Sequence, residues 1–247
     1  MRRICTALLA LATLATTASA STLMVGPRLG SSIPDLRDNS GGNDLSTGYS
    51  SRVTACAGVF ADMTLNPTLS LQLEADFVPQ GGKRDGIQIA PGVPNLPPGT
   101  NVYADFKNEA QLDYLEVPLL VKMHFGEAPR CYVCAGPYAG FLLSAHQVTS
   151  GTAQLYYDKA RQQPVVDGSD NPVSANFDAT TDVKSSLNST NYGVQFGLGA
   201  GRHFGSGEAF LDLRGELGLS NIQKDAVDGK NQTGALVVSA GYAWKVR

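Results

Sequence analysis

Apolar and polar residues alternate along three stretches of this chain. In residues 69–80, the odd positions from Leu69 to Phe77 are apolar, whereas the even positions from Ser70 to Asp76 are polar. Residues 114–125 and 208–220 repeat the pattern and confine most of their charges to one side. In a helix these charges would scatter around the axis, but in a strand each set lines one face. The pattern therefore predicts three β-strands.

Five weaker stretches of the same kind bring the predicted total to eight strands. They span about 23–33, 50–63, 132–147, 192–204 and 233–246. Three connections are short, and they lie around residues 65–66, 126–130 and 205–207. Four are long and rich in Gly, Pro, Asn, Asp and Ser, which is typical of irregular exposed chain. These long connections are 34–49, 81–104, 148–190 and 221–232.

Short and long connections alternate along the whole chain. An even number of strands with this alternation is typical of bacterial outer-membrane barrels, which have short periplasmic turns and long extracellular loops. The predicted fold is therefore all-β, an eight-stranded antiparallel up-and-down transmembrane β-barrel. A soluble lipocalin-like barrel would show the same alternation, with its leucines filling the interior instead of facing lipid.

Three features favour the lipid-facing alternative. The charges share a face with many glycines, which leave room for long polar side chains in a narrow lumen. The first and last strands meet at the short-turn side, as one closed barrel requires. Aromatic residues also collect near predicted strand ends: Phe77, Tyr103, Phe106, Phe125, Tyr132, Tyr192, Phe204, Tyr242 and Trp244.

The first twenty residues have the features of a secretory signal peptide. Arg2 and Arg3 precede an apolar run over residues 4–15, and Ala18-Ser19-Ala20 supplies a small-residue cleavage site. The run is shorter than the roughly 20 apolar residues that a spanning helix needs. We expect residues 1–20 to be removed and residues 21–247 to form one barrel domain, in the cell outer membrane and in contact with its lipid.

Composition excludes several other classes. The chain has 247 residues, 43% of them hydrophobic and 17% charged, which is too apolar for a disordered protein. Its formal charge of −3 gives no basic surface for nucleic acid. After residue 20 no segment reaches 18 uninterrupted apolar residues, so we expect no transmembrane helix.

If the leucines face lipid, nine charged residues enter the lumen. Eight strands leave an interior only wide enough for side chains to fill, and buried charges persist when they are paired. The sequence thus predicts a salt-bridged plug with a structural role, and an ion-conducting path is the less favoured alternative. The predicted network is Arg28, Arg52, Glu74, Asp76, Glu116, Lys122, Asp212, Arg214 and Glu216, four basic and five acidic groups.

Several runs resemble one known family. Residues 112–122 read LDYLEVPLLVK, residues 131–143 read CYVCAGPYAGFLL, and residues 69–83 read LSLQLEADFVPQGGK. They resemble segments of the PorT-family outer-membrane β-barrel proteins, with Phe77 where that family usually has Tyr. The resemblance implies an eight-stranded outer-membrane barrel of a Gram-negative bacterium and implies no reaction. The chain ends in WKVR, so we expect Tyr242 and Trp244 to carry the signal for the barrel-assembly machinery.

Two short motifs suggest chemistry that strand geometry disfavours. Cys131 and Cys134 have C-x-x-C spacing, but on a strand they point to opposite faces about 10 Å apart, beyond the reach of a disulfide. Zinc would need further ligands, which Cys56 alone cannot supply. The run Gly197-Leu-Gly-Ala-Gly201 lies in mid-strand with no helix after it, unlike a dinucleotide site. We expect neither cofactor nor metal.

Other motifs are also weak. Ser144 and His146 share the predicted lumen-side parity, but no acid completes a hydrolase triad. The runs DGSDN at 167–171 and DAVDGKN at 225–231 lack EF-hand spacing. Pro118 and Pro137 fall almost opposite one another across a hairpin, where we expect a local bulge or break because each removes a ladder donor.

The sequence thus predicts a non-enzymatic outer-membrane protein that anchors surface loops or supports the envelope. Loop 148–190 is the part most free to contact a protein partner. The alternatives are an accessory protein of a secretion system, a lipid-modifying hydrolase and, if the protein is soluble, a lipocalin-like carrier of an apolar ligand.

Overall fold

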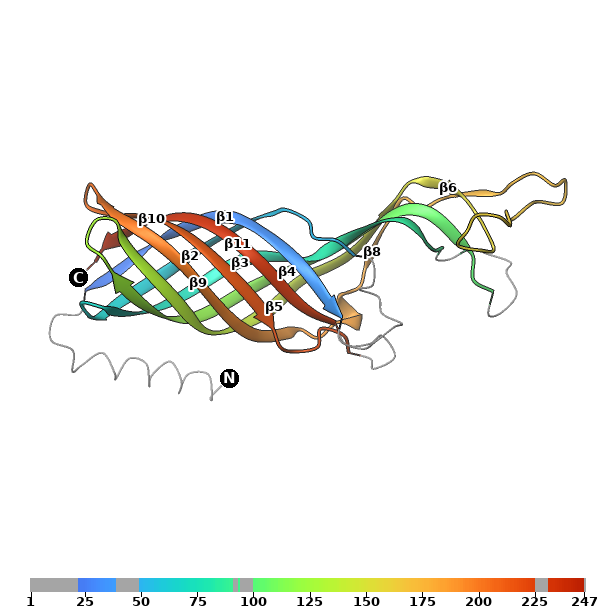
Figure 1. Ribbon diagram of the computed structural model, residues 1–247. Coiled ribbons are helices and arrows are strands. Elements are labelled where there is room, and N and C mark those ends of the chain that lie inside the picture. Colours follow the sequence, from blue (N-terminus) through green and yellow to red (C-terminus); the bar gives the residue numbers. More distant parts are fainter. Residues whose placement is uncertain (1–21, 39–48, 91–92, 94–99, 225–230, 247) are drawn as a thin grey trace.

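Eight long antiparallel strands close into a barrel (Figure 1). The computed structural model describes residues 22–38, 49–90, 93, 100–224 and 231–246, so the predicted signal peptide lies outside the described residues. β11 pairs with β1 and β4 pairs with β5, which gives each of the eight strands two neighbours. The barrel strands are β1 (Leu23–Asp38), β2 (Thr54–Asn66), β3 (Leu69–Ile89), β4 (Tyr103–Phe125), β5 (Arg130–Ser150), β9 (Thr190–Phe204), β10 (Gly207–Gly218) and β11 (Asn231–Lys245).

The predicted fold is confirmed. All eight predicted strands are present, and the short connections join β2 to β3, β4 to β5 and β9 to β10. These turns lie at the end of the barrel where the C-terminus is found (Figure 1), which we call the short-turn end. The opposite end, where the other connections lie, is the long-loop end. Among the described residues no helix is long and apolar enough to cross a membrane.

The barrel has its apolar residues outside and its charged residues inside. Leu29, Leu198 and Leu211 are each more than half exposed on the outer face. Glu74, Glu116 and Arg214 are each 2% exposed or less on the inner face. A soluble lipocalin-like barrel has the reverse arrangement, with apolar side chains filling the interior. The outer face of this barrel therefore suits hydrocarbon.

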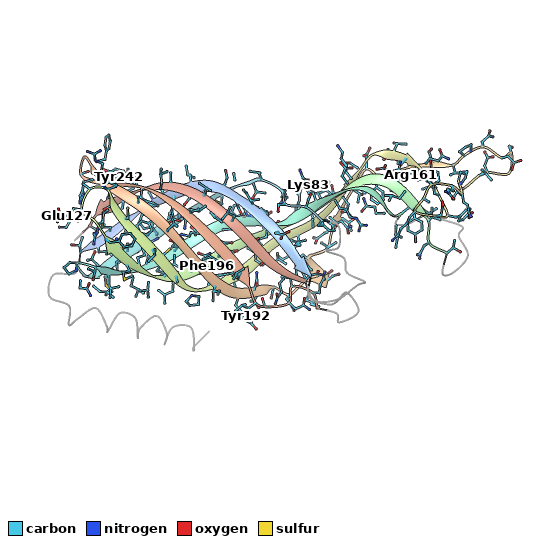
Figure 2. All side chains as sticks on the ribbon, viewed as in Figure 1. Lys83, Glu127, Arg161, Tyr192, Phe196 and Tyr242 are labelled. Carbon is cyan, nitrogen blue, oxygen red and sulfur yellow. The ribbon has the colours of Figure 1, made fainter. Side chains whose placement is uncertain are left out.

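Aromatic side chains on the outer face lie near both ends of the barrel. Phe125, Phe204 and Trp244 are exposed where β4, β9 and β11 reach the short-turn end. Tyr192 is exposed near the start of β9, towards the long-loop end (Figure 2), and Phe77 is exposed between the two ends. Two of the aromatic residues that were expected near strand ends are not on the outer face. Tyr132 is 2% exposed because its position on β5 points into the lumen. Phe106 is 3% exposed because β4 continues past the barrel into the arm, where Phe106 is buried.

An arm projects from the long-loop end (Figure 1). It comprises residues 81–90, 100–110 and 147–182 and includes the short strands β6 (Thr152–Gln154), β7 (Ser174–Asn176) and β8 (Ala179–Asp182). The prediction that residues 81–104 and 148–190 are irregular loops was therefore partly wrong. β3 and β4 stay paired as far as Ile89 and Tyr103, and β8 pairs with β5. The glycines at 81, 82 and 86 favour a loop in the sequence pattern, but β3 continues through all three.

The arm has an apolar core of its own. The rings of Phe106 and Phe177 stack with centroids 4.3 Å apart and an interplanar angle of 12°. Around them the buried members are Ala90, Val102, Ala104, Leu155 and Val165. The same face of β4 thus carries Phe106 in the arm core and Glu116 in the polar lumen. The polarity of one strand face inverts where the chain leaves the barrel.

The β4–β5 ladder is irregular at two places. Pro118 pairs with Tyr138 and Val121 pairs with Ala135, and the ladder is interrupted between these two pairs. The predicted break at Pro118 and Pro137 is confirmed. A register shift also lies where Asp113 and Tyr114 face Ser144 and Leu142. Leu143 is the extra, unpaired residue of this bulge. Beyond it the odd positions of β5 face inward, whereas before it the even positions do.

Candidate functional site

The centre of the lumen is a network built on two arginines. Arg214 on β10 donates to Asp212 through Nε at 2.7 Å and Nη2 at 2.8 Å, and to Glu74 on β3 through Nη1 at 2.6 Å. Arg28 on β1 also pairs with Glu74 and donates to Asp76 at 3.3 Å. Each guanidinium therefore has carboxylate partners, as a buried ion requires.

A second group lies nearer the short-turn end. Lys122 donates to Gln72 at 2.8 Å, pairs with Asp62 at 3.2 Å and lies 4.0 Å from the centroid of the Tyr132 ring. The Tyr132 hydroxyl donates to Asp212 at 2.9 Å, which joins this group to the arginine network. Strands from all around the barrel are thereby linked through its interior.

A third layer contains two carboxylates without a basic partner. The amide of Gln80 donates to Glu116 at 3.2 Å and to Glu216 at 3.1 Å. The amide of Gln195 donates to the same two residues at 3.2 and 2.9 Å. Among the described residues no ion pair is formed by either glutamate. The expectation that both glutamates belong to a salt-bridged network was therefore wrong, because neutral amides hold them instead.

The nine predicted charged residues do not all meet. Arg52 lies towards the long-loop end, where it is half-buried, pairs with Glu109 at 2.6 Å and donates to the Gln80 carbonyl at 3.0 Å. Asp62, which is not one of the nine predicted residues, is also buried. The buried charged side chains of the described barrel are thus three basic and six acidic: Arg28, Lys122, Arg214, Asp62, Glu74, Asp76, Glu116, Asp212 and Glu216. The expected near-neutral balance was wrong.

Neutral amides also belong to the luminal network, and the sequence analysis did not assign them. Gln72, Gln80 and Gln195 are 2% exposed or less and each bonds at least one luminal carboxylate. Gln72 and Gln80 lie on the same face of β3 as Glu74 and Asp76, so their period-two parity predicts a luminal position.

Glycines on the inner face leave space for large side chains. A Cβ atom at Gly199 would overlap the Tyr132 ring, and one at Gly193 would overlap the Tyr138 ring. A Cβ at Gly197 would lie 2.8 Å from Cγ of Arg214. The alternating glycines of β9 are therefore a packing feature of the lumen, and they present no helix N-terminus to a phosphate.

Side chains fill the lumen around these charges. One cavity beside Arg28, Asp76 and Glu216 holds about 10 Å³, and another beside Lys122 and Tyr132 holds about 30 Å³. Each has room for one or two water molecules. The described lumen therefore resembles a filled core and not an open pore.

Among the described residues, Ser144 and His146 are not joined in a catalytic triad. Beyond the bulge, Ser144 lies on the outward side of β5, where its hydroxyl donates to Asp113 at 2.6 Å, so the expected luminal parity of Ser144 and His146 was wrong. Elsewhere Ser70 lies 2.9 Å from Nε2 of His124, but Ser70 is 1% exposed and the adjoining cavity holds about 30 Å³. That space would not admit a lipid substrate.

Cysteines and loop aspartates form no metal cluster in the described part of the chain. Cys56, Cys131 and Cys134 are free thiols. Asp167 accepts backbone hydrogen bonds from Asn171 at 3.0 Å and Ser169 at 2.8 Å, which lower the pKa of its carboxyl. The DGSDN run is thus a self-bonded turn at the tip of the arm. Residues 225–230 of the second aspartate run lie outside the described residues.

Comparison with known proteins gives the family. The model of the outer membrane protein beta-barrel domain matches residues 15–224. No curated protein matches the chain.

Three solved structures that resemble this chain are each 12% identical to it. Ail of Yersinia pestis has a TM-score of 0.38, with 90% of this chain and 98% of that chain covered. Neisserial surface protein A has a TM-score of 0.37, with 92% and 99% covered. OprG of Pseudomonas aeruginosa has a TM-score of 0.42, with 91% and 96% covered. By the match of its family model, this chain belongs to the outer membrane protein beta-barrel domain family and resides in the outer membrane, in contact with its lipid.

Proposed function

We propose that the protein is a non-enzymatic anchor that presents its arm to a protein partner at the cell surface. One observation carries this proposal: the arm is packed around its own apolar core, centred on Phe106 and Phe177. An irregular loop has no such core, so its conformation is less restricted. A packed arm on a filled barrel can hold a binding surface in a fixed position.

The orientation follows the rule for this class of protein. Outer-membrane barrels place short turns in the periplasm and long connections outside the cell. On that rule the short-turn end, with Glu127 and Tyr242 near it, faces the periplasm, and the arm faces outward (Figure 2). We further propose that the barrel-assembly machinery inserts the chain by recognising the C-terminal end of β11. This end carries Tyr242 and Trp244, whose ring centroids are 5.0 Å apart.

The proposal is tested by site-specific photocrosslinking on intact cells. A benzophenone side chain replaces Tyr157, which is 46% exposed in the arm, or Tyr192, which is 60% exposed on the lipid-facing wall. We expect a discrete protein adduct from position 157 and none from the matched position 192. Equal adducts from both positions, or none from several arm positions, would contradict the proposal.

A second candidate is an accessory role in protein secretion within the PorT family. The observation that favours it is the run LDYLEVPLLVK at residues 112–122, which forms most of the part of β4 that lies in the barrel wall. A deletion strain that lacks secreted proteins, and regains them with the wild-type chain, would support this role. Normal secretion by that strain would exclude it.

A further inference from the structure

A cavity of about 250 Å³ lies at the long-loop end, between the barrel wall and the loops above the lumen. Its volume equals about eight water molecules of liquid. We call it the rim cavity. It is lined by Leu36, Tyr49, Ala110, Leu112, His146, Gln147, Val183, Ser186, Leu187, Ile222, Gln223 and Asn231.

The rim cavity has an apolar floor and a polar edge. Leu112, Leu187 and Ile222 are each 6% exposed or less and belong to one buried cluster. Gln147, on the inward side of β5 beyond the bulge, and Gln223 are partly exposed. A mostly apolar hollow with a few polar groups at its edge is the usual composition of a small-molecule site.

Among the lining side chains that the structure describes, none is an acid, a lysine or an arginine. Lys184 and Lys224 lie beside the cavity in sequence, but their ammonium groups donate to the carbonyls of Leu143 at 2.6 Å and Ser185 at 2.7 Å. Burial raises the pKa of Tyr49, so its hydroxyl stays neutral. Against this described lining an ionised ligand would lose its hydration without gaining an opposite charge, which disfavours its binding.

One wall of the rim cavity is a strap formed by residues 183–188, which include the 3₁₀ turn η2 (Lys184–Ser186). The strap is held at both ends. Val183 donates its N–H to Ala145 at 3.0 Å, and Asn188 donates its N–H to the Ile222 carbonyl at 2.8 Å. The Asn188 side chain adds a bond to Gln223 at 3.0 Å. The cavity thus has a built wall.

We propose that the rim cavity binds a small neutral amphiphile, with its apolar part on Leu112, Leu187 and Ile222 and its polar end at Gln147. The filled lumen below the cavity gives the ligand no passage through the barrel. The site is therefore for binding and not for transport, and it is separate from the proposed partner surface of the arm.

Isoleucine methyl groups provide a direct test. The chain has five isoleucines, at 4, 33, 87, 89 and 222. Ile222 lines the cavity, Ile33 faces lipid, and Ile87 and Ile89 lie in the arm. The experiment titrates benzyl alcohol into the isoleucine-methyl-labelled protein in lipid nanodiscs and follows the methyl resonances by NMR.

We expect a saturable shift at Ile222, no saturation at Ile33, and no shift in the arm. Benzoate and benzylammonium should bind at least about tenfold more weakly, which corresponds to about 1.4 kcal/mol. Leu187→Trp, which fills the cavity, should abolish saturation, whereas Leu219→Trp on the lipid-facing wall should preserve it.

A response at Ile222 that merely follows Ile33 would mean partition into lipid only and would overturn the proposal. So would equal binding of the charged compounds. If Leu187→Trp does not fold, the wild-type titration with the three compounds still decides the result.

Discussion

Arg214 on β10 and Glu74 on β3 form an ion pair across the lumen, with Nη1 and Oε2 2.6 Å apart and both side chains at most 1% exposed. The two residues are 140 positions apart in sequence. The bond therefore joins distant strands, and Asp212 accepts hydrogen bonds from Nε and Nη2 of the same guanidinium.

Removal of Arg214 should destabilise the barrel strongly. Arg214→Leu leaves Glu74 and Asp212 without this cation, and loss of one partner of a buried ion pair typically costs about 3–5 kcal/mol. The measurement is the urea concentration at which the unheated gel band loses its folded mobility. Arg202→Leu, at an exposed position on β9, is the matched control and should change the midpoint little. Equal midpoints for the two variants would contradict the network.

Glu116→Gln should behave differently. Glu116 accepts hydrogen bonds only from the neutral amides of Gln80 and Gln195 among its described contacts. The substitution removes one of six buried acidic groups and leaves no cation without its partner. We therefore expect the unfolding free energy to stay within about 1 kcal/mol of wild type or to rise. The same gel assay measures it. A loss as large as that of Arg214→Leu would show that Glu116 has a cationic partner after all.

Gly199 should tolerate no side chain while Tyr132 is present. A Cβ at this position would overlap the Tyr132 ring, and overpacking of this kind costs about 1–3 kcal/mol. We expect Gly199→Val to lower the urea midpoint and Tyr132→Ala in the same chain to recover part of the loss. Gly168→Ala in the arm, where a Cβ meets nothing within 4 Å, is the control. Strictly additive effects of Gly199→Val and Tyr132→Ala would argue against this packing contact.

The arm core should unfold separately from the barrel. Phe106→Ala removes one ring of the stacked pair with Phe177, and such truncations cost about 3–5 kcal/mol. We expect rapid proteolysis within residues 147–182 and unchanged heat-modifiable mobility of the barrel. Val166→Ala, at a side chain 44% exposed, should leave the arm resistant. Loss of the folded barrel band in Phe106→Ala would mean that arm and barrel unfold together.

The barrel could be predicted from the sequence because one physical rule governs its wall. Leucines at odd positions of β3 and β10 face lipid and charges at even positions face the lumen, so period-two alternation reveals each strand. The arm could not be predicted by the same rule. On β4 the even positions change from Glu116 in the lumen to Phe106 in an apolar core. The alternation of polar and apolar residues that defines the barrel strand therefore stops near Leu115, although the strand continues into the arm.

The lumen was only partly predictable. Parity identifies which charges point inward, but partner choice depends on register across strands that are distant in sequence. Arg52, one layer nearer the long-loop end, pairs with Glu109, and the bulge at Leu143 turns Ser144 outward. Neither follows from a single strand read alone.

The most direct test of the whole account is thiol labelling of intact cells with a membrane-impermeant maleimide. Cys56, Cys131 and Cys134 are first replaced by alanine, and a single cysteine is then placed at Ser169 in the tip of the arm or at Glu127 in the β4–β5 turn, both exposed. The account predicts labelling of Ser169→Cys on intact cells and of Glu127→Cys only after the outer membrane is permeabilised. Labelling of Glu127→Cys on intact cells, with Ser169→Cys protected, would contradict the orientation on which surface presentation of the arm depends.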